Sequence, residues 1–480
     1  MNSTSMNQPT TGTGVGAVEV DMPMPGGDAQ MRLIEACKGN ASLYELYLRL
    51  PKLADDLESD PTMKKYGFSV ADTVKALRKG NSWAMCELLH SIPSGAAKSI
   101  VRGTVAYDIE HGQFPCYETP VRNAVFKDQI PGVYVVSMSR FKMTPQGRDN
   151  LDGRFLNGKE IKMVIADINK YIDGYNVHVQ FQKDLHNGRV TSIKDLSAPD
   201  AQALDHLKMV DGFAHVGSQW SCPVYIKKQS HIDKHRALVR TLTTMCTSDP
   251  TEIVRMKQGP LYVGCSKDLA KRTQVYNQNN IKDINKPLGL TLSILRKLDL
   301  DVKVNVSVVL RTWKGEQLAM AEQLVTTLAG SLVFQYGFNA TESGGTGSQT
   351  VKSAESLRIN TEYIMSLKQY MRDNLKGTLC ELEQREIFLE ILDQTQNDTR
   401  HIRDALVRCA DKLKALPQNI RWSDKLDELK KLHARLQEDL KDREEKLKLL
   451  DLLLEIQQMV FEETGKPVIR LKRRYAASRT

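Results

Sequence analysis

The sequence predicts an α+β protein with a helical N-terminal region, a mixed central part and a C-terminal region of long helices. Three observations support this fold class. Apolar residues recur at helical spacing over residues 29–100, strand-like segments interrupt residues 115–340, and a heptad pattern runs through residues 426–461. The chain has 480 residues, which is enough for about three domains.

The N-terminal part divides into two segments. Residues 1–28 are rich in Ser, Thr, Gly, Pro and Met without periodicity, which predicts a disordered leader. Residues 29–110 form the predicted helical region. Its first long apolar stripe includes Leu43, Leu46 and Leu50, and we expect Pro51 to end that helix. Shorter helices are predicted at residues 70–77 and 82–92.

Residues 111–215 form a mixed α/β region in which we identify no chemistry. Residues 132–136 have strand character, and residues 161–172 have helical spacing. Residues 177–181 alternate in polarity and precede the turn pair Asn187-Gly188. They therefore predict a β-hairpin with residues 190–193 as the second strand.

The C-terminal part is predicted to be helical after a linker. Gly and Ser dominate residues 341–353, which predicts a flexible linker. Residues 354–463 form the predicted helical or coiled-coil region. Its heptad core positions are Leu426, Leu429, His433, Leu436, Leu440, Arg443, Leu447, Leu450, Leu454, Gln457 and Phe461. Such a stripe favours self-association or docking of a protein partner, although an amphipathic helix packed within the chain has the same pattern.

Composition excludes several classes of protein. No apolar run approaches the roughly 20 residues that span a bilayer, and the first 25 residues lack the pattern of a signal peptide. The eight cysteines include no CxxC pair, which argues against a zinc ribbon or a redox motif. We therefore expect an intracellular protein, nuclear or cytoplasmic and not secreted, with reduced thiols.

Positive charge is concentrated in two places. The net charge is +9, and residues 222–300 contain 14 Lys or Arg against 6 Asp or Glu. Residues 464–480 form a basic tail, with 6 Lys or Arg and no acidic residue from residue 466 onward. This distribution is typical of polyanion binding, and the tail also fits a nuclear-import signal, although solvated faces have the same composition.

One run of residues carries chemistry. Tyr262-Val263-Gly264 ends a predicted strand, and Ser266 or Asp268 can cap the helix that follows. Arg272 then lies on the first turns of that helix, and Tyr276 is four residues further on. Residues at this spacing share one helix face. The three side chains can therefore converge on one surface.

This run resembles the signature of the GIY-YIG nuclease family. The family has a strand ending in YIG or YVG and then S-x-D-L-x-x-R on a helix, which here reads Tyr262-Val263-Gly264-Cys265-Ser266-Lys267-Asp268-Leu269-Ala270-Lys271-Arg272. The resemblance implies a small antiparallel sheet flanked by helices over residues 216–340. It also implies a His or Tyr one turn after the arginine, a metal-binding glutamate on a later helix and a final asparagine. Tyr276, Glu322 and Asn339 fit these positions, with Glu316 as a second candidate for the glutamate.

The first half of the family signature, G-I-Y, has two candidates. Pro223-Val224-Tyr225 lies nearer to Tyr262, and an inserted helix over residues 231–245 would account for the gap between them. Gly132-Val133-Tyr134 matches the motif better but is far more distant in the sequence. We therefore take Tyr225 as the first tyrosine and Tyr134 as the alternative.

The resemblance implies hydrolysis of DNA phosphodiester bonds. Glu322 would hold one Mg²⁺ or Mn²⁺, since such ions keep several waters and one protein carboxylate is enough. Arg272 would bind the phosphate oxygens, the tyrosines would orient or deprotonate the attacking water, and Asn339 would hold the helix or the metal shell. Basic side chains would bind the DNA backbone; they are Lys227, Lys228, Lys234, Arg236, Arg240, Lys267 and Lys271.

Three functions remain open at this stage. The first is a metal-dependent endonuclease of the GIY-YIG type. The second is a protein of the same fold that binds nucleic acid without cleaving it, because phosphate binding needs only the arginine and the lysines. The third is a coiled-coil regulatory or resistance factor that acts through protein partners.

Overall fold

The computed structural model describes residues 28–39, 41–78, 82–120, 129–144, 147–149, 152–214, 220, 223–246, 251–277, 281–344, 350–415 and 423–464. Most of the predicted leader, the centre of the predicted linker and residues 465–480 of the basic tail lie outside these ranges. The α+β fold class is confirmed, because the structure is mostly helical around a small antiparallel sheet.

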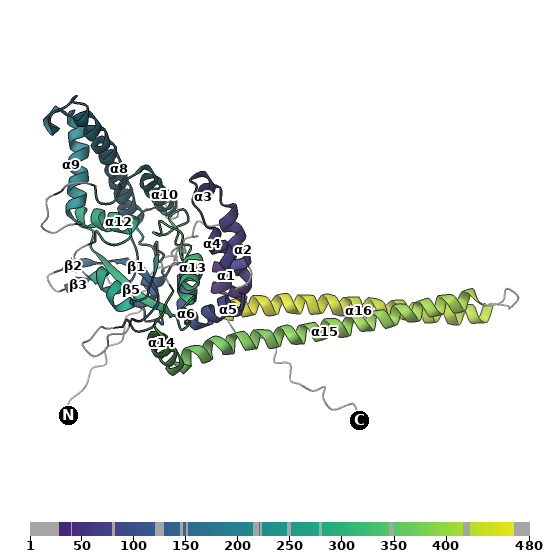
Figure 1. Cartoon of the computed structure of the whole chain (residues 1–480). Helices are drawn as coiled ribbons and strands as arrows, with labels where there is room; N and C mark the ends of the chain where they lie inside the picture. Colours follow the sequence, from purple (N-terminus) through teal and green to yellow (C-terminus); the bar gives the residue numbers. More distant parts are fainter. Residues whose placement is uncertain are drawn as a thin grey trace, which may run out of the picture.

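The sheet has three strands in the order β4-β1-β5 (Figure 1). The central strand β1 (Gly132–Arg140) pairs antiparallel with β4 (Tyr262–Ser266) on one side and with β5 (Val302–Arg311) on the other. The predicted strand at residues 132–136 is thus confirmed and is longer. In the β1–β4 register, Tyr134 lies opposite Gly264. A separate pair of short strands, β2 (Lys142–Thr144) and β3 (Gly147–Asp149), follows β1.

The N-terminal helices cover one face of the sheet. They are α1 (Asp28–Lys38), α2 (Leu43–Ser59), α3 (Pro61–Lys65), α4 (Ala71–Arg78), α5 (Ser82–Ser91), α6 (Ser94–Arg102) and α7 (Val105–Glu110). Together with α13 (Gln317–Ala329), they bury Val133, Val135 and Val263 in one apolar cluster. The prediction that Pro51 ends its helix is wrong, since α2 continues to Ser59. The buried Leu53 and Leu57 compensate for the hydrogen bond that proline cannot donate.

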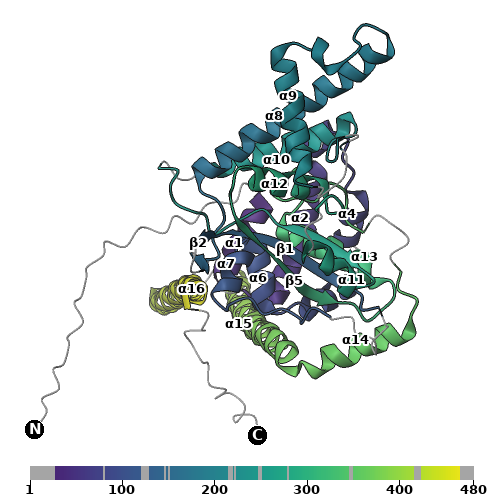
Figure 2. The ribbon, with the colours of Figure 1, turned by 90° about the vertical axis from the view of Figure 1, so that its left-hand side faces the viewer.

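The opposite face of the sheet is covered by α8 (Gly158–His186), α9 (Ala198–Gly212), α10 (Gln229–Cys246) and α12 (Lys286–Lys297) (Figure 2). The short helices η1 (Ile193–Asp195), α11 (Leu269–Gln274) and η2 (Val275–Asn277) complete this part. Tyr134 and Val136 of β1 point into this second apolar cluster. Successive side chains of β1 thus point alternately into the two apolar clusters, as expected for a strand.

The predicted β-hairpin over residues 177–193 is wrong. Residues 177–181 lie inside α8, and residues 190–193 form no strand. Asn157 and Glu160 cap the start of α8 reciprocally, and the buried Ile161, Val164 and Ile168 begin its apolar stripe. The helical spacing of buried apolar residues continues past residue 172. It outweighs the alternation of polar and apolar residues at 177–181. The distal halves of α8 and α9 project from the body as an arm (Figure 1).

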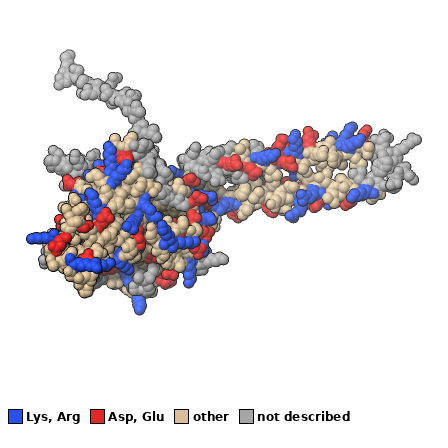
Figure 3. All heavy atoms as spheres, turned by 90° about the horizontal axis from the view of Figure 1, so that it is seen from above, with Lys and Arg blue, Asp and Glu red and all other residues tan. Residues whose placement is uncertain are grey.

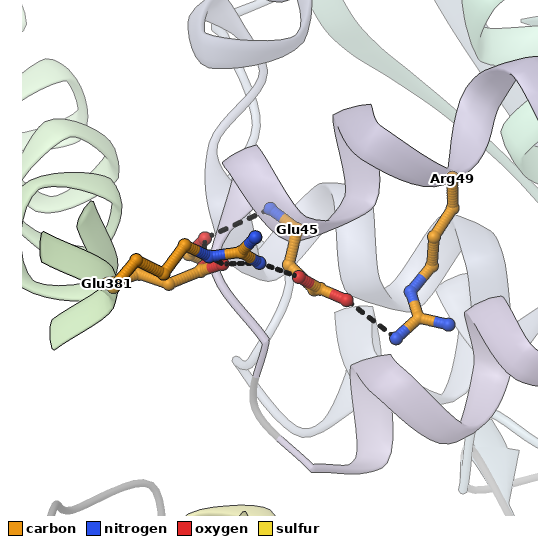
Figure 4. Close-up of polar contacts among 5 residues, drawn as sticks. Glu45, Arg49 and Glu381 are labelled. Atoms are coloured by element: carbon orange, nitrogen blue, oxygen red, sulfur yellow. Dashed lines mark hydrogen bonds and ion pairs between the residues drawn. The ribbon is translucent and has the colours of Figure 1, made fainter. Parts of the chain in front are cut away.

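The C-terminal helices confirm the prediction for residues 354–463. They are α14 (Ala354–Ser366), α15 (Lys368–Lys414) and α16 (Ser423–Thr464), and the last two run antiparallel as a projecting hairpin (Figure 1). Polar contacts fix the base of α15 on the body. Asn374 Nδ2 donates to the carbonyls of His90 and Ile92 at 2.6 and 2.8 Å. Arg385 donates to Glu45, and Ser42 donates to Glu381 (Figure 4).

The sequence segments that we predicted as separate regions share their cores. The N-terminal helices pack with Leu261, Val263 and Leu324 of the later segment. Strand β1, from the predicted region 111–215, is the centre of the sheet. None of the helices in the described part of the chain has the length and apolarity to cross a membrane.

Candidate active site at the edge of the sheet

Four side chains converge at the edge strand β4, and we call them the tyrosine cluster: Tyr134, Tyr262, Arg272 and Tyr276. Arg272 Nε donates to Tyr134 Oη at 2.9 Å. The hydroxyls of Tyr134 and Tyr276 share a hydrogen bond of 3.3 Å. The ring of Tyr262 lies 6.3 Å from that of Tyr134 and 6.4 Å from that of Tyr276, measured between centroids. The three aromatic rings therefore surround one guanidinium.

The local sequence explains how Arg272 reaches this position. Ser266 Oγ accepts from the Asp268 amide at 3.0 Å, which turns the chain after β4. Asp268 then caps α11 by accepting from the Lys271 amide at 3.0 Å. The expected cap and helix are thus confirmed, and Arg272 lies on the first turn and a half of α11. Tyr276 follows in the 3-10 turn η2.

Gly264 is required by the packing of Tyr134. A Cβ atom at this position would lie 2.5 Å from Tyr134 Oη and 2.6 Å from Tyr134 Cζ. Any larger residue would push the Tyr134 hydroxyl away from Arg272. The glycine that ends the sequence run thus allows the tyrosine from the neighbouring strand to cross over β4.

Burial keeps the tyrosine hydroxyls protonated. Desolvation raises the pKa of Tyr134, Tyr262 and Tyr276 above the ordinary value, and the nearby Arg272 opposes this only partly. At neutral pH these groups are hydrogen-bond donors and acceptors. They can orient a water or a phosphate oxygen, but they do not act as bases without a further charge beside them.

Glu322 lies beside the tyrosine cluster on α13. Its Oε2 accepts from the Gly344 amide at 2.9 Å, and it also forms hydrogen bonds with the amide and the thiol of Cys265 on β4. Burial raises the pKa of Glu322, while these hydrogen bonds and the nearby Arg272 oppose the shift. The competing candidate, Glu316, is exposed and precedes the first turn of α13.

Asn339 is buried and pairs with the backbone of the edge strand. Its Oδ1 accepts from the Val263 amide at 2.9 Å, and its Nδ2 donates to the Val263 carbonyl at 2.7 Å. The side chain thus takes the place of a neighbouring strand at this point of β4. It holds the strand that carries Tyr262, rather than a helix or the groups around Glu322.

The structure does not bring Tyr225 to the tyrosine cluster. Its ring is fully buried 6.0 Å from that of Tyr171, and its hydroxyl shares a 2.6 Å hydrogen bond with Ser293 on α12. The tyrosine that bonds to Arg272 is instead Tyr134, in the segment Gly132-Val133-Tyr134. The expected inserted helix at residues 231–245 is confirmed as α10, but the whole insertion is longer and separates β1 from β4.

The predicted DNA-backbone residues divide into two groups. Lys267 and Lys271 lie beside the tyrosine cluster, at the end of β4 and on α11. The others lie at or on α10: Lys227, Lys228, Lys234, Arg236 and Arg240. Burial and the neighbouring Lys228 lower the pKa of Lys234, so positive charge is crowded there. Seen from above, the body carries Lys and Arg interspersed with acidic residues (Figure 3).

A divalent ion would have Glu322 as its protein ligand. In the part of the chain that the structure describes, no group of three or more His, Cys, Asp or Glu could hold a metal ion. Within the same residues, the nearby Arg272 acts on Glu322 through its charge, and the carboxylate accepts hydrogen bonds from Gly344 and Cys265. Mg²⁺ or Mn²⁺ at this place would retain water in the remaining positions and would share the Glu322 carboxylate with the Gly344 and Cys265 groups.

No protein-family model matches this chain, and neither a curated protein nor a solved structure matches it. The arrangement of the site therefore rests on its own geometry. Sequence reasoning ranked Tyr134 second and missed the Cys265 and Gly344 contacts to Glu322. The G-V-Y motif was a readable signal for Tyr134, whereas no pattern in the sequence points to the Gly344 amide.

Proposed function

We propose that this chain is a metal-dependent endonuclease of the GIY-YIG type that hydrolyses DNA phosphodiester bonds. The observation that supports this best is the convergence of Tyr134 and Arg272, which are far apart in the sequence, at the edge of β4. In this proposal, Gly132-Val133-Tyr134 and Tyr262-Val263-Gly264 are the two halves of the family signature. They lie on paired strands although a long insertion separates them in sequence.

Each residue of the site has a role that its surroundings support. Arg272 uses Nε for Tyr134, and its terminal nitrogens would hold the nonbridging oxygens of the scissile phosphate. The protonated hydroxyls of Tyr262 and Tyr276 would orient the attacking water. Lys267 and Lys271 would bind the adjacent phosphates. Glu322 would hold Mg²⁺ or Mn²⁺, and a bound ion of this kind supplies charge stabilisation at the phosphate and the leaving oxygen.

A cleavage assay tests the proposal. Supercoiled plasmid and branched DNA are incubated with the purified chain in Mg²⁺ or Mn²⁺, and nicking is followed on gels. We expect metal-dependent nicking that falls by about 10³-fold in both Arg272→Ala and Glu322→Ala, since each removes charge stabilisation from the transition state. Glu316→Ala is the matched control, because that carboxylate is exposed and stands just before the helix that carries Glu322.

Two results would contradict cleavage and point to the other functions. Salt-sensitive DNA binding without nicking, unchanged in Glu322→Ala, would indicate a protein that only holds nucleic acid. Two hydrogen bonds favour this second candidate, because they already occupy groups that cleavage would need. Arg272 Nε donates to Tyr134, and Glu322 accepts from the Gly344 amide. Absence of both nicking and binding would indicate a regulatory protein that acts through protein partners.

A further inference from the structure

A cavity of about 320 Å³ lies between the N-terminal helices and α10. This volume is at the lower end of the range for small-molecule sites, roughly 300–1,000 Å³, so it fits one small ligand. Residues of α1 and α2 line one part of the cavity, and residues of α10, the end of α13 and residues 334–336 line the rest. Neither the tyrosine cluster nor Glu322 lines it. The cavity is therefore a separate site that does not depend on the proposed cleavage.

Two glutamines that line the cavity have side-chain oxygens without a hydrogen-bond partner among the described residues. Gln30 is only 3% exposed, and its Nε2 donates to the Leu328 carbonyl at 3.2 Å. This bond fixes the orientation of the amide and leaves its Oε1 without a partner. The Oε1 atom of Gln335 is buried and unpartnered as well. Because an unpaired buried acceptor costs free energy, both oxygens favour a ligand that donates hydrogen bonds.

Opposite charges line the same cavity from two helices. Asp56 of α2 accepts from the Ala29 amide at 3.0 Å through Oδ2, and its Oδ1 has no partner within the described ranges. Burial and the charge of Asp56 raise the pKa of the neighbouring Tyr336, which also lines the cavity. Arg240 of α10 lies 5.5 Å from the centroid of the Tyr66 ring. No ion pair joins Arg240 to Asp56, so both charges can bind a ligand.

Helix α10 carries a second arginine beside the cavity. Arg236 stands one turn before Arg240, and residues at this spacing share one helix face. Both side chains are exposed, and neither forms an ion pair with a carboxylate of the described residues. Guanidinium groups bind phosphate oxygens through paired N–H donors. The two arginines therefore favour a phosphate at the outer part of the cavity.

The ring of Phe334 gives the cavity an aromatic wall. It stacks on Tyr66, with 5.6 Å between the centroids and 24° between the planes, and lies 4.9 Å from the ring of Phe68. These contacts hold Phe334 in place before any ligand binds. Leu53 and Leu57 add apolar surface to the same cavity. A flat heterocyclic ring can pack against such surfaces while its edge forms hydrogen bonds.

We propose that this cavity binds a free guanine nucleotide. Its acceptors without a partner are Gln30 Oε1, Gln335 Oε1 and Asp56 Oδ1. Guanine matches them, because it presents N1–H and its amino group as donors along one edge. The phosphate would bind Arg240 and Arg236. A guanidinium ligand offers similar donors, but it would place its positive charge in a cavity that Arg240 lines, which costs free energy.

Calorimetric titration of the full-length chain with guanosine monophosphate tests the proposal. We expect one molecule to bind per chain, and adenosine monophosphate to bind at least about 100-fold more weakly, because adenine leaves acceptors of the cavity unpaired. Inosine monophosphate, which lacks only the amino group, should bind about 10-fold more weakly than guanosine monophosphate. Three results would overturn the proposal: no binding of guanosine monophosphate at millimolar concentration, equal binding of adenosine monophosphate, or binding only of a guanine-containing DNA strand.

Asp56→Asn tests the contact with the base. The asparagine oxygen can still accept from the Ala29 amide, so the helix content measured by circular dichroism should be unchanged. We expect the affinity for guanosine monophosphate to fall by at least about 10-fold, because a charged acceptor is lost. Asp55→Asn is the matched control, since Asp55 pairs with Arg78 and does not line the cavity. An equal loss in both variants would show that the charge of α2, rather than the cavity, governs binding, and would overturn the proposal.

Arg240→Gln tests the contact with the phosphate. Arg240 is exposed, so the substitution should leave the fold intact. We expect the affinity for guanosine monophosphate to fall by about 10-fold, and the affinity for guanosine, which has no phosphate, to stay the same. An equal loss for both ligands, or no loss for either, would contradict a phosphate at Arg240 and overturn this orientation of the nucleotide.

Discussion

The tyrosine cluster and the α15–α16 hairpin differ in how completely the chain packs each of them. The cluster lies where two apolar cores meet a strand edge, and its side chains are positioned by neighbours from β1, β4 and α11. The hairpin contacts the body at its base and leaves leucines of α15 exposed. The comparison teaches that packing within the chain positions the cluster, whereas it leaves leucines of the hairpin in contact with solvent. Substitutions in the cluster should therefore affect chemistry, whereas substitutions of the exposed leucines should not.

Among substitutions that change only the packing of the cluster, the largest effect is expected from Gly264→Ala. The new methyl group would collide with Tyr134 and separate its hydroxyl from Arg272. Displacements of about 1 Å in such sites can reduce rates by about 100-fold. We expect a loss of that size in the plasmid-nicking assay.

Gly212→Ala is the control for this substitution. Nothing lies within 4 Å of a Cβ at Gly212, at the end of α9, so activity should persist. Equal nicking by Gly264→Ala and the wild-type chain would show that contact between Tyr134 and Arg272 is not needed for cleavage.

A smaller effect, on stability rather than on rate, is expected from Glu322→Gln. Burial raises the pKa of this carboxyl, so the folded chain binds its proton more tightly than the unfolded chain does. The ionised carboxylate therefore costs stability as the pH rises above the ordinary pKa of a glutamate. We expect the variant to melt about 2 °C higher than the wild-type chain at pH 8.

Two further measurements sharpen the interpretation of Glu322→Gln. The difference in melting temperature should vanish near pH 4, where the wild-type carboxyl is protonated as well. Mg²⁺ should raise the melting temperature of the wild-type chain and not that of the variant. Two results would contradict a buried, ion-binding carboxylate at residue 322. One is a variant that melts at a lower temperature than the wild-type chain at pH 8, and the other is an equal rise of both melting temperatures in Mg²⁺.

The sequence predicted the local parts of the site better than the long-range ones. Strand β4, the Asp268 cap and the placement of Arg272 and Tyr276 depend on neighbouring residues, and they follow from the sequence. The partner of Arg272, Tyr134, does not follow from the sequence in this way. Strand β1 pairs with β4 across a long insertion, and nearness in sequence favoured Tyr225 instead. Pairing of distant strands depends on the whole core, which no local pattern encodes.

The same distinction holds for the helices. The long C-terminal helices were predictable from their heptad and charge patterns. The strand expected at residues 177–181 failed because the capped helix α8, which begins at Gly158, runs through it. The exposed leucines of α15 were missed for a different reason. The heptad pattern was followed over residues 426–461, so no face was assigned to the leucines of α15 before the structure showed several of them exposed.

The most direct test of the site is a comparison of Tyr134→Phe and Tyr225→Phe in the metal-dependent nicking assay. Tyr134 Oη bonds to Arg272, whereas Tyr225 Oη bonds only to Ser293 in the core. We expect Tyr134→Phe to lose at least about 10-fold in rate, and Tyr225→Phe to keep its rate while losing about 1 kcal/mol of stability. Full activity of Tyr134→Phe, or a loss confined to Tyr225→Phe, would contradict the assignment of the tyrosine cluster as the active site.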